Sequence, residues 1–174
     1  MKHVFVATDG SDTAMKAIDM AAEMAAKFDV PLTVGHVLQF ARPSAELARM
    51  AEIEHLAQSA SQKSTVDFRV LTGHSGDLFS DTRPSGDVVT AITAIGDEIV
   101  HRADARAREL GVREVDTMTE QGDPADAILD MATSAGADVI VVGHRGLGRL
   151  KSLLLGSVAQ KVLQHADCTV ISVR

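Results

Sequence analysis

Short apolar runs alternate with longer amphipathic segments along this chain, and no other feature of the sequence constrains the fold as strongly. Residues 4–7 are continuously apolar and end at a Thr-Asp-Gly turn, as a buried strand would. Residues 11–28 follow with apolar side chains at helical spacing, and residues 31–38 are strand-like again. This succession predicts a βαβ unit, whose two strands are parallel and joined by a right-handed crossover.

The same alternation continues in the second half of the chain. Residues 87–110 carry apolar side chains on one helical face, and Gly111 follows as a stop signal. Gly96 lies inside this segment and weakens its helical character. Residues 112–118 then alternate between apolar and polar side chains, which predicts another strand.

The last third of the chain is well punctuated. Asp123 is a capping residue type, and Pro124 suits the first position of the helix that follows. Residues 137–142 (ADVIVV) are apolar throughout, as in a central parallel strand that is buried on both faces. A short helix over 157–166 and a strand over 168–173 complete the series.

Five strands separated by helices predict an α/β fold: an open, doubly wound, five-stranded parallel sheet with helices on both faces. The length of 174 residues suits one domain, which we place at 1–174. Residues 39–86 form an insertion after the second strand, much longer than usual connections, with a helix expected over 42–60 and a strand over 66–70. The insertion is interpreted either as family-specific decoration or as a lid or partner-binding flap.

Composition excludes some function classes. The net charge of −7 and an aromatic content of 3% argue against nucleic acid as a partner, because phosphates attract cations and bases stack on aromatic rings. No apolar segment approaches the roughly 18 residues of a membrane span, so no membrane association is expected. Cys168 is the single cysteine, and the N-terminus has no signal-peptide pattern. We therefore expect a soluble cytoplasmic protein.

Two unusual features follow the ends of predicted strands. Asp9 closes the first strand, and a glycine-rich stretch over 143–157 follows the apolar strand at 137–142. Ligands of open α/β sheets bind beyond the carboxyl ends of strands, at the point where the strand order reverses. If these two strands are neighbours there, a carboxylate and a glycine-rich loop face one crevice.

The glycine-rich stretch suits an anion. Gly143, Gly146 and Gly148 lack Cβ atoms, which lets backbone N–H groups approach a ligand closely. Gly156 and Ser157 open a helix whose N–H groups and dipole favour a phosphate, although Ser157 alternatively serves only as a helix cap. The stretch also carries side chains able to screen phosphate charge, namely His144, Arg145, Arg149 and Lys151.

Two familiar phosphate-binding motifs are absent. The segment that begins at Gly143 lacks the P-loop signature, because Arg149 and Leu150 stand where Lys and Ser or Thr belong. A dinucleotide fingerprint fails as well, since the first strand is followed by TDGSDT and Gly146-x-Gly148 has no third glycine.

The spacing Gly143-x₂-Gly146-x₉-Gly156-Ser157 resembles the nucleotide-binding signature of the universal stress protein family, G-x₂-G-x₉-G-[ST]. The resemblance extends to VFVATDGS, to GDPADAILDMATSAGADVIVVGHRG and to the C-terminal GSVAQKVLQHADCTVISVR, and is poorest over 39–86. It implies the sheet of the adenine nucleotide alpha hydrolase-like fold. Only some members bind ATP, and an intact glycine signature implies the ATP-binding subgroup.

The resemblance also implies roles for residues at the nucleoside end of the site. Asp9 would contact the ribose or lie near a metal-phosphate group, with Ala7 and Thr8 lining the crevice. The backbone of Val37, at the end of the second strand, would contact the adenine edge. Two further residues are implied to hold ribose and adenine, Val142 and Gly143.

At the phosphate end, main-chain N–H groups and a serine hydroxyl are implied as ligands. The residues concerned are Gly146, Gly156, Ser157 and Val158, with Arg145 and Gly148 in the same loop. His144 departs from the serine that many nucleotide-binding members carry, which makes that side of the pocket bulkier. ATP, with Mg²⁺ as a possible companion, is the expected cofactor, and no metal ligands are assigned.

The sequence favours a regulatory nucleotide-binding protein over an enzyme, and no catalytic residue is assigned. Asp9 and His144 are the side chains that the topology places near a γ-phosphate, and neither has a recognisable catalytic partner. His36 is interpreted as a packed strand residue. Two alternatives remain: a slow ATPase or self-phosphorylating enzyme that uses the same site, and an interaction module without nucleotide.

The final strand is expected at a sheet edge, where exposed apolar strands pair readily. The resemblance implies dimerisation through that strand, so we expect a homodimer through 168–173. A further protein partner would sense the nucleotide state.

Overall fold

The computed structural model describes residues 1–40, 86–145 and 155–174, where strands and helices alternate along the chain. The elements are β1 (Val4–Ala7), α1 (Asp12–Phe28), β2 (Leu32–Leu38), α5 (Gly86–Glu109), β3 (Val115–Gln121), α6 (Pro124–Ser134), β4 (Val139–Gly143), α7 (Ser157–His165) and β5 (Thr169–Val173). The helix expected over 42–60 and the strand expected over 66–70 lie outside the described residues.

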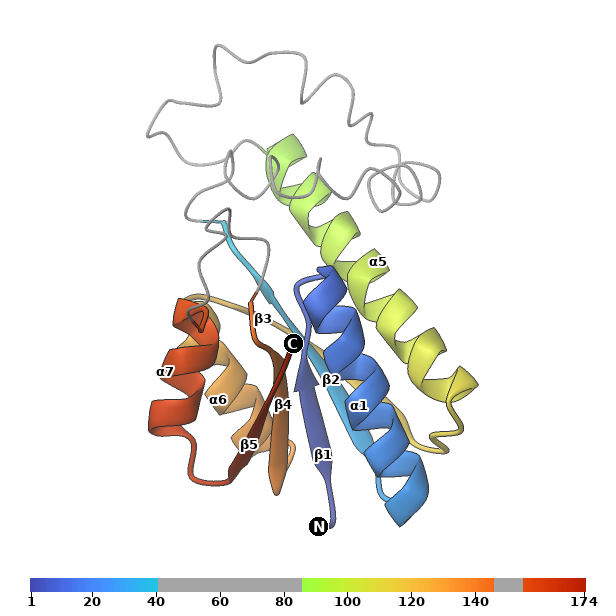
Figure 1. Ribbon diagram of the computed structural model, residues 1–174. Helices are drawn as coiled ribbons and strands as arrows, with labels where there is room; N and C mark the ends of the chain where they lie inside the picture. Colours follow the sequence, from blue (N-terminus) through green and yellow to red (C-terminus); the bar gives the residue numbers. More distant parts are fainter. Residues whose placement is uncertain (41–85, 146–154) are drawn as a thin grey trace.

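All five strands form one parallel sheet in the order β3-β2-β1-β4-β5, which confirms the predicted fold class (Figure 1). β1 lies at the centre, and its last residue, Ala7, pairs with Gly35 of β2 on one side and Val142 of β4 on the other. The strand order therefore reverses between β1 and β4. β5 lies at an edge of the sheet, as the sequence predicted.

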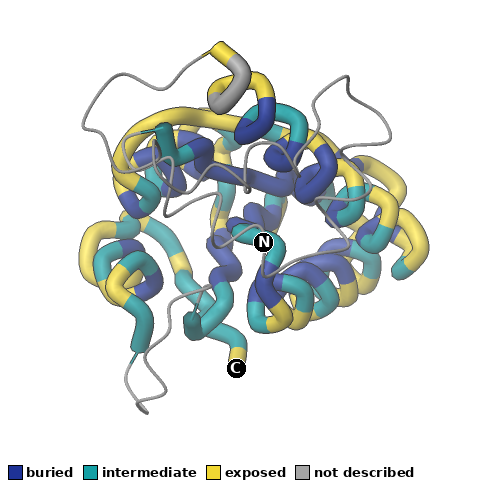
Figure 2. Tube along the Cα trace, turned by 90° about the horizontal axis from the view of Figure 1, so that it is seen from above, coloured by how far each residue is buried: buried dark blue, intermediate teal, exposed yellow. Residues whose placement is uncertain are grey.

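Two helical layers cover the sheet. α1 and α5 pack on one face and α6 and α7 on the other (Figure 1). In the view along the strands the buried segments lie between the layers, and the helices turn their buried sides inward and their exposed sides outward (Figure 2). Strands β1 and β2 are buried along their whole length because helices cover both of their faces. No helix in the described ranges has the length and apolar character that crossing a membrane requires.

Helix boundaries follow the capping residues. The Ser11 side chain accepts from the N–H of Ala14 at the start of α1, and Asp29 ends that helix in the left-handed conformation. Asp123 accepts from two N–H groups in the first turn of α6, whose first residue is Pro124, as predicted. α6 thus begins at Pro124, after its cap Asp123, for the reasons that the sequence indicates.

The third strand differs from its predicted bounds of 112–118, because it begins at Val115 and ends at Gln121. Val112 is buried but lies in the turn that follows α5, which ends at Glu109. Its N–H donates to the carbonyl of Ala107 at 3.2 Å, and Gly111 adopts a φ of +94°. This arrangement terminates a helix and buries the apolar residue that follows the glycine. The apolar character of Val112 therefore reflects helix termination and not strand pairing.

Gly96 lies within α5 because this helix packs closely on the end of β2. A Cβ atom at this position would lie 2.5 Å from Cδ2 of Leu38 and 3.2 Å from Cδ2 of His36. The residue that weakened the helix prediction is thus at a point where the helix backbone lies close to the sheet.

Candidate functional site

The carboxyl ends of β1 and β4 lie side by side at the point where the strand order reverses. Three groups of residues meet there: the turn Thr8-Asp9-Gly10 after β1, the end of β4 at Gly143, and the start of α7 at Gly156. We call this arrangement the switch-point site. It is the position at which doubly wound sheets bind ligands.

The turn after β1 is held by its own side chains. The Asp9 carboxylate accepts from the N–H of Ser11 at 3.1 Å, and the Thr8 hydroxyl accepts from the N–H of Gly10 at 3.2 Å. Gly10 has a φ of +79°, which favours glycine. Thr8 is buried, whereas Asp9 is half-buried.

The end of β4 lies directly against the first turn of α1. A Cβ atom on Gly143 would lie 3.1 Å from both the nitrogen of Ala14 and the carbonyl carbon of Thr13. The Thr13 hydroxyl also donates to the carbonyl oxygen of Arg145 and lies 3.2 Å from the Ser11 hydroxyl. Gly143 therefore leaves little space for a Cβ atom between β4 and α1, independently of any ligand.

The start of α7 lacks a side-chain cap. Gly156 is the N-cap residue and Ser157 is the first helical residue, so the serine does not cap the helix. The N–H of Gly156 donates to the carbonyl of His144 at 2.9 Å, which joins the start of α7 to the end of β4. Both other helix starts with an assigned cap, at Ser11 and Asp123, use a side chain. Within the part of the chain that the structure describes, the first turn of α7 therefore presents backbone N–H donors without a side-chain cap at the switch-point site.

α7 is also attached to α6 at its outer surface. The Lys161 ammonium group lies 3.1 Å from a carboxylate oxygen of Asp123 and 2.7 Å from one of Asp126. The hydrogen bond from Lys161 is the largest of the effects that lower the pKa of Asp123 below its usual value. These contacts join α7 to the start of α6 at the protein surface.

His144 points toward the edge strand. Its Nδ1 lies 3.3 Å from the Ser172 hydroxyl of β5, and its Nε2 is buried. Burial lowers the pKa of the His144 imidazole, and the nearby charges of Arg174 and Arg145 lower it further. The ring is therefore neutral at pH 7 and supplies no positive charge, in contrast to the screening role that the sequence indicated.

The remaining predicted site residues are distributed as follows. Ala7 and Val37 are buried at the ends of β1 and β2, and Val142 is buried in β4. Ser157 is exposed and Val158 is half-buried in the first turn of α7. Predicted residues that lie outside the described ranges are Gly146, Gly148, Arg149 and Lys151.

Sequence reasoning missed two contributors to this site. Thr13 joins α1 to the segment after β4, and the Nδ1 atom of His36 lies 2.8 Å from the carbonyl oxygen of Thr8. Thr13 sits in an ordinary amphipathic helix, and His36 sits in a strand, so neither carried a local signal. Their contacts arise from packing between elements distant in the sequence.

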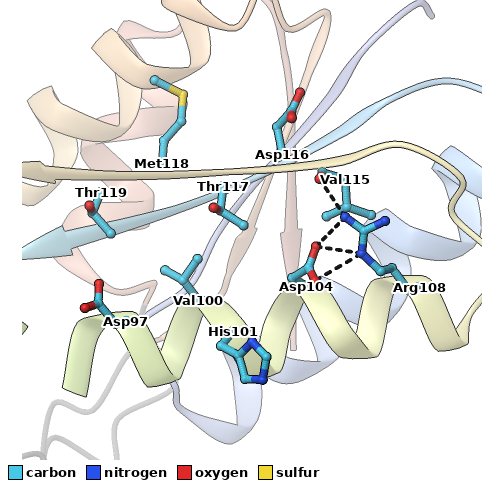
Figure 3. A pocket seen from close by; sticks show the side chains of 10 residues that line it. All are labelled: Asp97, Val100, His101, Asp104, Arg108, Val115, Asp116, Thr117, Met118 and Thr119. Atoms are coloured by element: carbon cyan, nitrogen blue, oxygen red, sulfur yellow. Dashed lines mark hydrogen bonds and ion pairs between the residues drawn. The ribbon is translucent and has the colours of Figure 1, made fainter. Parts of the chain in front are cut away.

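A groove of about 510 Å³ lies elsewhere, between α5 and the edge strand β3 (Figure 3). Three carboxylates line it, from Asp97, Asp104 and Asp116. The guanidinium of Arg108 is already bound to Asp104 and to the carbonyl of Val115, as the dashed lines in Figure 3 show. This excess of negative charge disfavours phosphate groups. Among the residues that the structure describes, no cluster of three potential ligands suited to a metal ion occurs.

These features define a doubly wound α/β protein whose strand order reverses between β1 and β4. The model of the universal stress protein family matches residues 1–174, and the chain belongs to that family. It is 31% identical over 173 residues to the universal stress protein YxiE of Bacillus subtilis, covering 98% of this chain and 97% of YxiE. It is 33% identical over 172 residues to the universal stress protein Rv1636 of Mycobacterium tuberculosis, covering 99% and 95% respectively.

Solved structures of the family share the fold. UspA of Lactobacillus plantarum has a TM-score of 0.64 at 21% identity, covering 99% of this chain and 97% of UspA. A universal stress protein of Archaeoglobus fulgidus in complex with dAMP has a TM-score of 0.60 at 22% identity, covering 100% and 98%. A universal stress protein in complex with cAMP has a TM-score of 0.58 at 21% identity, covering 99% of this chain and 96% of that protein.

Proposed function

We propose that this universal stress protein binds ATP at the switch-point site and acts as a nucleotide-dependent regulatory protein in a stress response. The observation that carries the proposal is the start of α7, where no side chain of the described residues caps the helix and the backbone N–H groups of the first turn lie beside the end of β4. Such a helix start attracts phosphate through its N–H groups and its dipole. Two structural relatives in complex with adenine nucleotides, cAMP and dAMP, support the ligand class.

In this proposal the triphosphate lies on the first turn of α7. Ser157 and Val158 donate main-chain N–H groups, and the exposed Ser157 hydroxyl adds a further hydrogen bond. The N–H of Gly156 is bound to the His144 carbonyl, so Gly156 contributes close approach of the backbone and not a donor. The phosphate-binding set is completed by loop residues, namely Arg145, Gly146 and Gly148, with His144 beside them. The neutral ring of His144 faces β5, so positive charge near the phosphates comes from Arg145 and other cations such as Mg²⁺.

The nucleoside lies toward β1 and β2. Asp9 binds the ribose or the metal-phosphate end, and the buried residues Ala7 and Thr8 form the floor of the site. The backbone of Val37 contacts the adenine edge. Val142 and Gly143, at the end of β4, contact ribose and adenine.

The nucleotide content of the purified protein tests the proposal. The protein is denatured by heat, and the supernatant is separated by anion exchange. A stoichiometric ATP peak supports the proposal, whereas ADP that accumulates with added ATP indicates hydrolysis. Absence of nucleotide, together with no calorimetric signal on titration with Mg-ATP, contradicts it.

Ser157→Ala is expected to weaken ATP binding. Thr133→Ala on the outer surface of α6 is the matched control, since the Thr133 hydroxyl donates only within that helix.

The proposal includes a homodimer formed through β5. This strand lies at the sheet edge, and its apolar residues Val170, Ile171 and Val173 are half-buried in the single chain. An edge with unpaired backbone groups and apolar side chains readily pairs with a second copy. Sedimentation at micromolar concentration is expected to give twice the chain mass of 18.4 kDa. A mass of one chain contradicts the dimer and leaves the nucleotide proposal intact.

A further inference from the structure

His36 lies in β2, with its ring between the sheet and α5. The side chain is buried, with 3% of its surface exposed. It follows Gly35, which pairs with the last residue of β1. Gly96 of α5 lets the helix approach the ring, because a Cβ atom there would lie 3.2 Å from Cδ2 of His36. The imidazole therefore lies beside the turn that begins with Thr8.

One ring nitrogen of His36 has a definite role. Nδ1 lies 2.8 Å from the carbonyl oxygen of Thr8. A carbonyl oxygen only accepts hydrogen bonds, so Nδ1 carries the proton and donates. The other nitrogen, Nε2, is buried, and no described residue forms a hydrogen bond with it. The neutral ring with its proton on Nδ1 satisfies this environment best, since a proton on Nε2 would be a buried donor without an acceptor.

The charges around the ring do not reverse this conclusion. Asp9, after β1, and Asp97, on α5, both favour a protonated ring, as does the hydrogen bond to Thr8. Burial opposes them and is the largest effect, so the pKa of His36 lies below its usual value. The imidazole is therefore neutral at pH 7.

The backbone of Thr8 is held by two consecutive residues of β2, and the His36 ring supplies one of these contacts. The N–H of Thr8 donates to the carbonyl of Gly35 at 2.9 Å, and its carbonyl accepts from His36. Both backbone polar groups of Thr8 are thus bound by neighbouring residues of β2. The next residue, Asp9, accepts from the N–H of Ser11. The direction of the Asp9 carboxylate consequently depends on a turn whose first residue is fixed by β2.

We propose that His36 is a positioning residue of the nucleotide site: by donating from Nδ1 to the Thr8 carbonyl, it fixes the turn that directs Asp9 toward the ligand. His36 acts through the Thr8 backbone and touches no ligand itself. The inference rests on the proposed function, because it assigns a role in the ATP site. It adds a residue from the face of the sheet that α5 covers, outside the glycine signature.

A pair of isosteric variants separates the donor from the shape of the side chain. His36→Asn retains an N–H donor attached to Cγ, as in the imidazole, whereas His36→Leu has the same branching without a donor. ATP affinity is measured by calorimetry. We expect His36→Leu to weaken binding about fivefold, the effect of losing one hydrogen bond of ordinary strength. We expect His36→Asn to stay within about twofold of the wild type, because its N–H replaces that bond.

The control is a histidine at the other end of the same sheet. Nε2 of His3 lies 2.8 Å from the Thr33 hydroxyl, near the amino ends of the strands. His3→Leu removes this hydrogen bond and is expected to leave ATP affinity unchanged. Wild-type affinity in His36→Leu overturns the inference. Equal losses in His36→Leu and His36→Asn also overturn it, since they would assign the effect to packing.

Two measurements without nucleotide keep this inference separate from the proposed function. Nitrogen NMR of the wild-type ring is expected to show the proton on Nδ1, and a proton on Nε2 overturns the inference even where a variant does not fold. Amide hydrogen exchange at Gly10 and Ser11 is expected to be faster in His36→Leu than in His36→Asn. If the wild type binds no ATP, the proposed function fails, and unchanged exchange in His36→Leu then overturns the positioning role as well.

Discussion

Gly143→Ala tests whether the glycine at the end of β4 serves packing or only ligand access. The added Cβ atom would lie 3.1 Å from the nitrogen of Ala14 and from the carbonyl carbon of Thr13, and 3.2 Å from the carbonyl oxygen of Arg145. All three are backbone atoms, so no side-chain rotation relieves the contact. Either α1 or the end of β4 must move by a few tenths of an ångström.

Overpacking of this kind costs about 1–3 kcal/mol. A loss of about 2 kcal/mol lowers the melting temperature of a protein of this size by about 4–8 °C. The assay is thermal unfolding without nucleotide, followed by circular dichroism. Gly86→Ala is the matched control, because a Cβ atom at the first residue of α5 would meet no atom within 4 Å. Its free energy of unfolding is expected to change by less than about 0.5 kcal/mol.

The two explanations of Gly143 predict different results. If packing against α1 requires the glycine, Gly143→Ala melts well below Gly86→Ala in the absence of any ligand. If the glycine serves only the approach of a nucleotide, both variants have the same melting temperature. Gly143→Ala then differs from Gly86→Ala in its lower ATP affinity alone. That second result would refute our account of how β4 meets α1.

Two further predictions concern the same end of the sheet. Gly35→Ala places a Cβ atom 2.3 Å from Cζ of the fully buried Phe5. The free energy of unfolding, measured with guanidinium, is expected to fall by about 1–3 kcal/mol. Unchanged stability would contradict the observed packing. Because the pKa of His36 lies below the 6.5 of an unfolded chain, the unfolded state binds more protons as pH falls below that value. Its contribution to stability is complete above pH 6.5 and declines below it toward the lowered pKa. Urea unfolding at a series of pH values should show this decline, and His36→Asn should lack it.

The overall fold was predictable because its determinants are local in the sequence. A buried parallel strand requires a continuous apolar run, and residues 4–7 and 137–142 have one. Capping residues such as Asp123 then mark where a helix begins. Predictions were weaker at the edge strand β3, whose outer residues are exposed and polar and therefore lack a clear apolar pattern.

The internal contacts of the site were not predictable from the sequence. Thr13 and Arg145 are 132 residues apart, and His36 and Thr8 are 28 apart, so no local pattern links either pair. The glycine spacing indicated an anion site, but it did not reveal that Gly143 also lies in close contact with α1. These contacts can be identified only from the structure, in which β4 lies beside β1 and packs against α1.

The central claim is that an adenine nucleotide binds between the turn after β1 and the first turn of α7. Amide NMR of nitrogen-labelled protein titrated with Mg-ATP tests this claim most directly. We predict that the largest shifts occur at Ser157 and Val158, with further shifts at Asp9, Gly10 and Val37. Shifts confined to the groove between α5 and β3, or no shifts at millimolar nucleotide, would contradict the account.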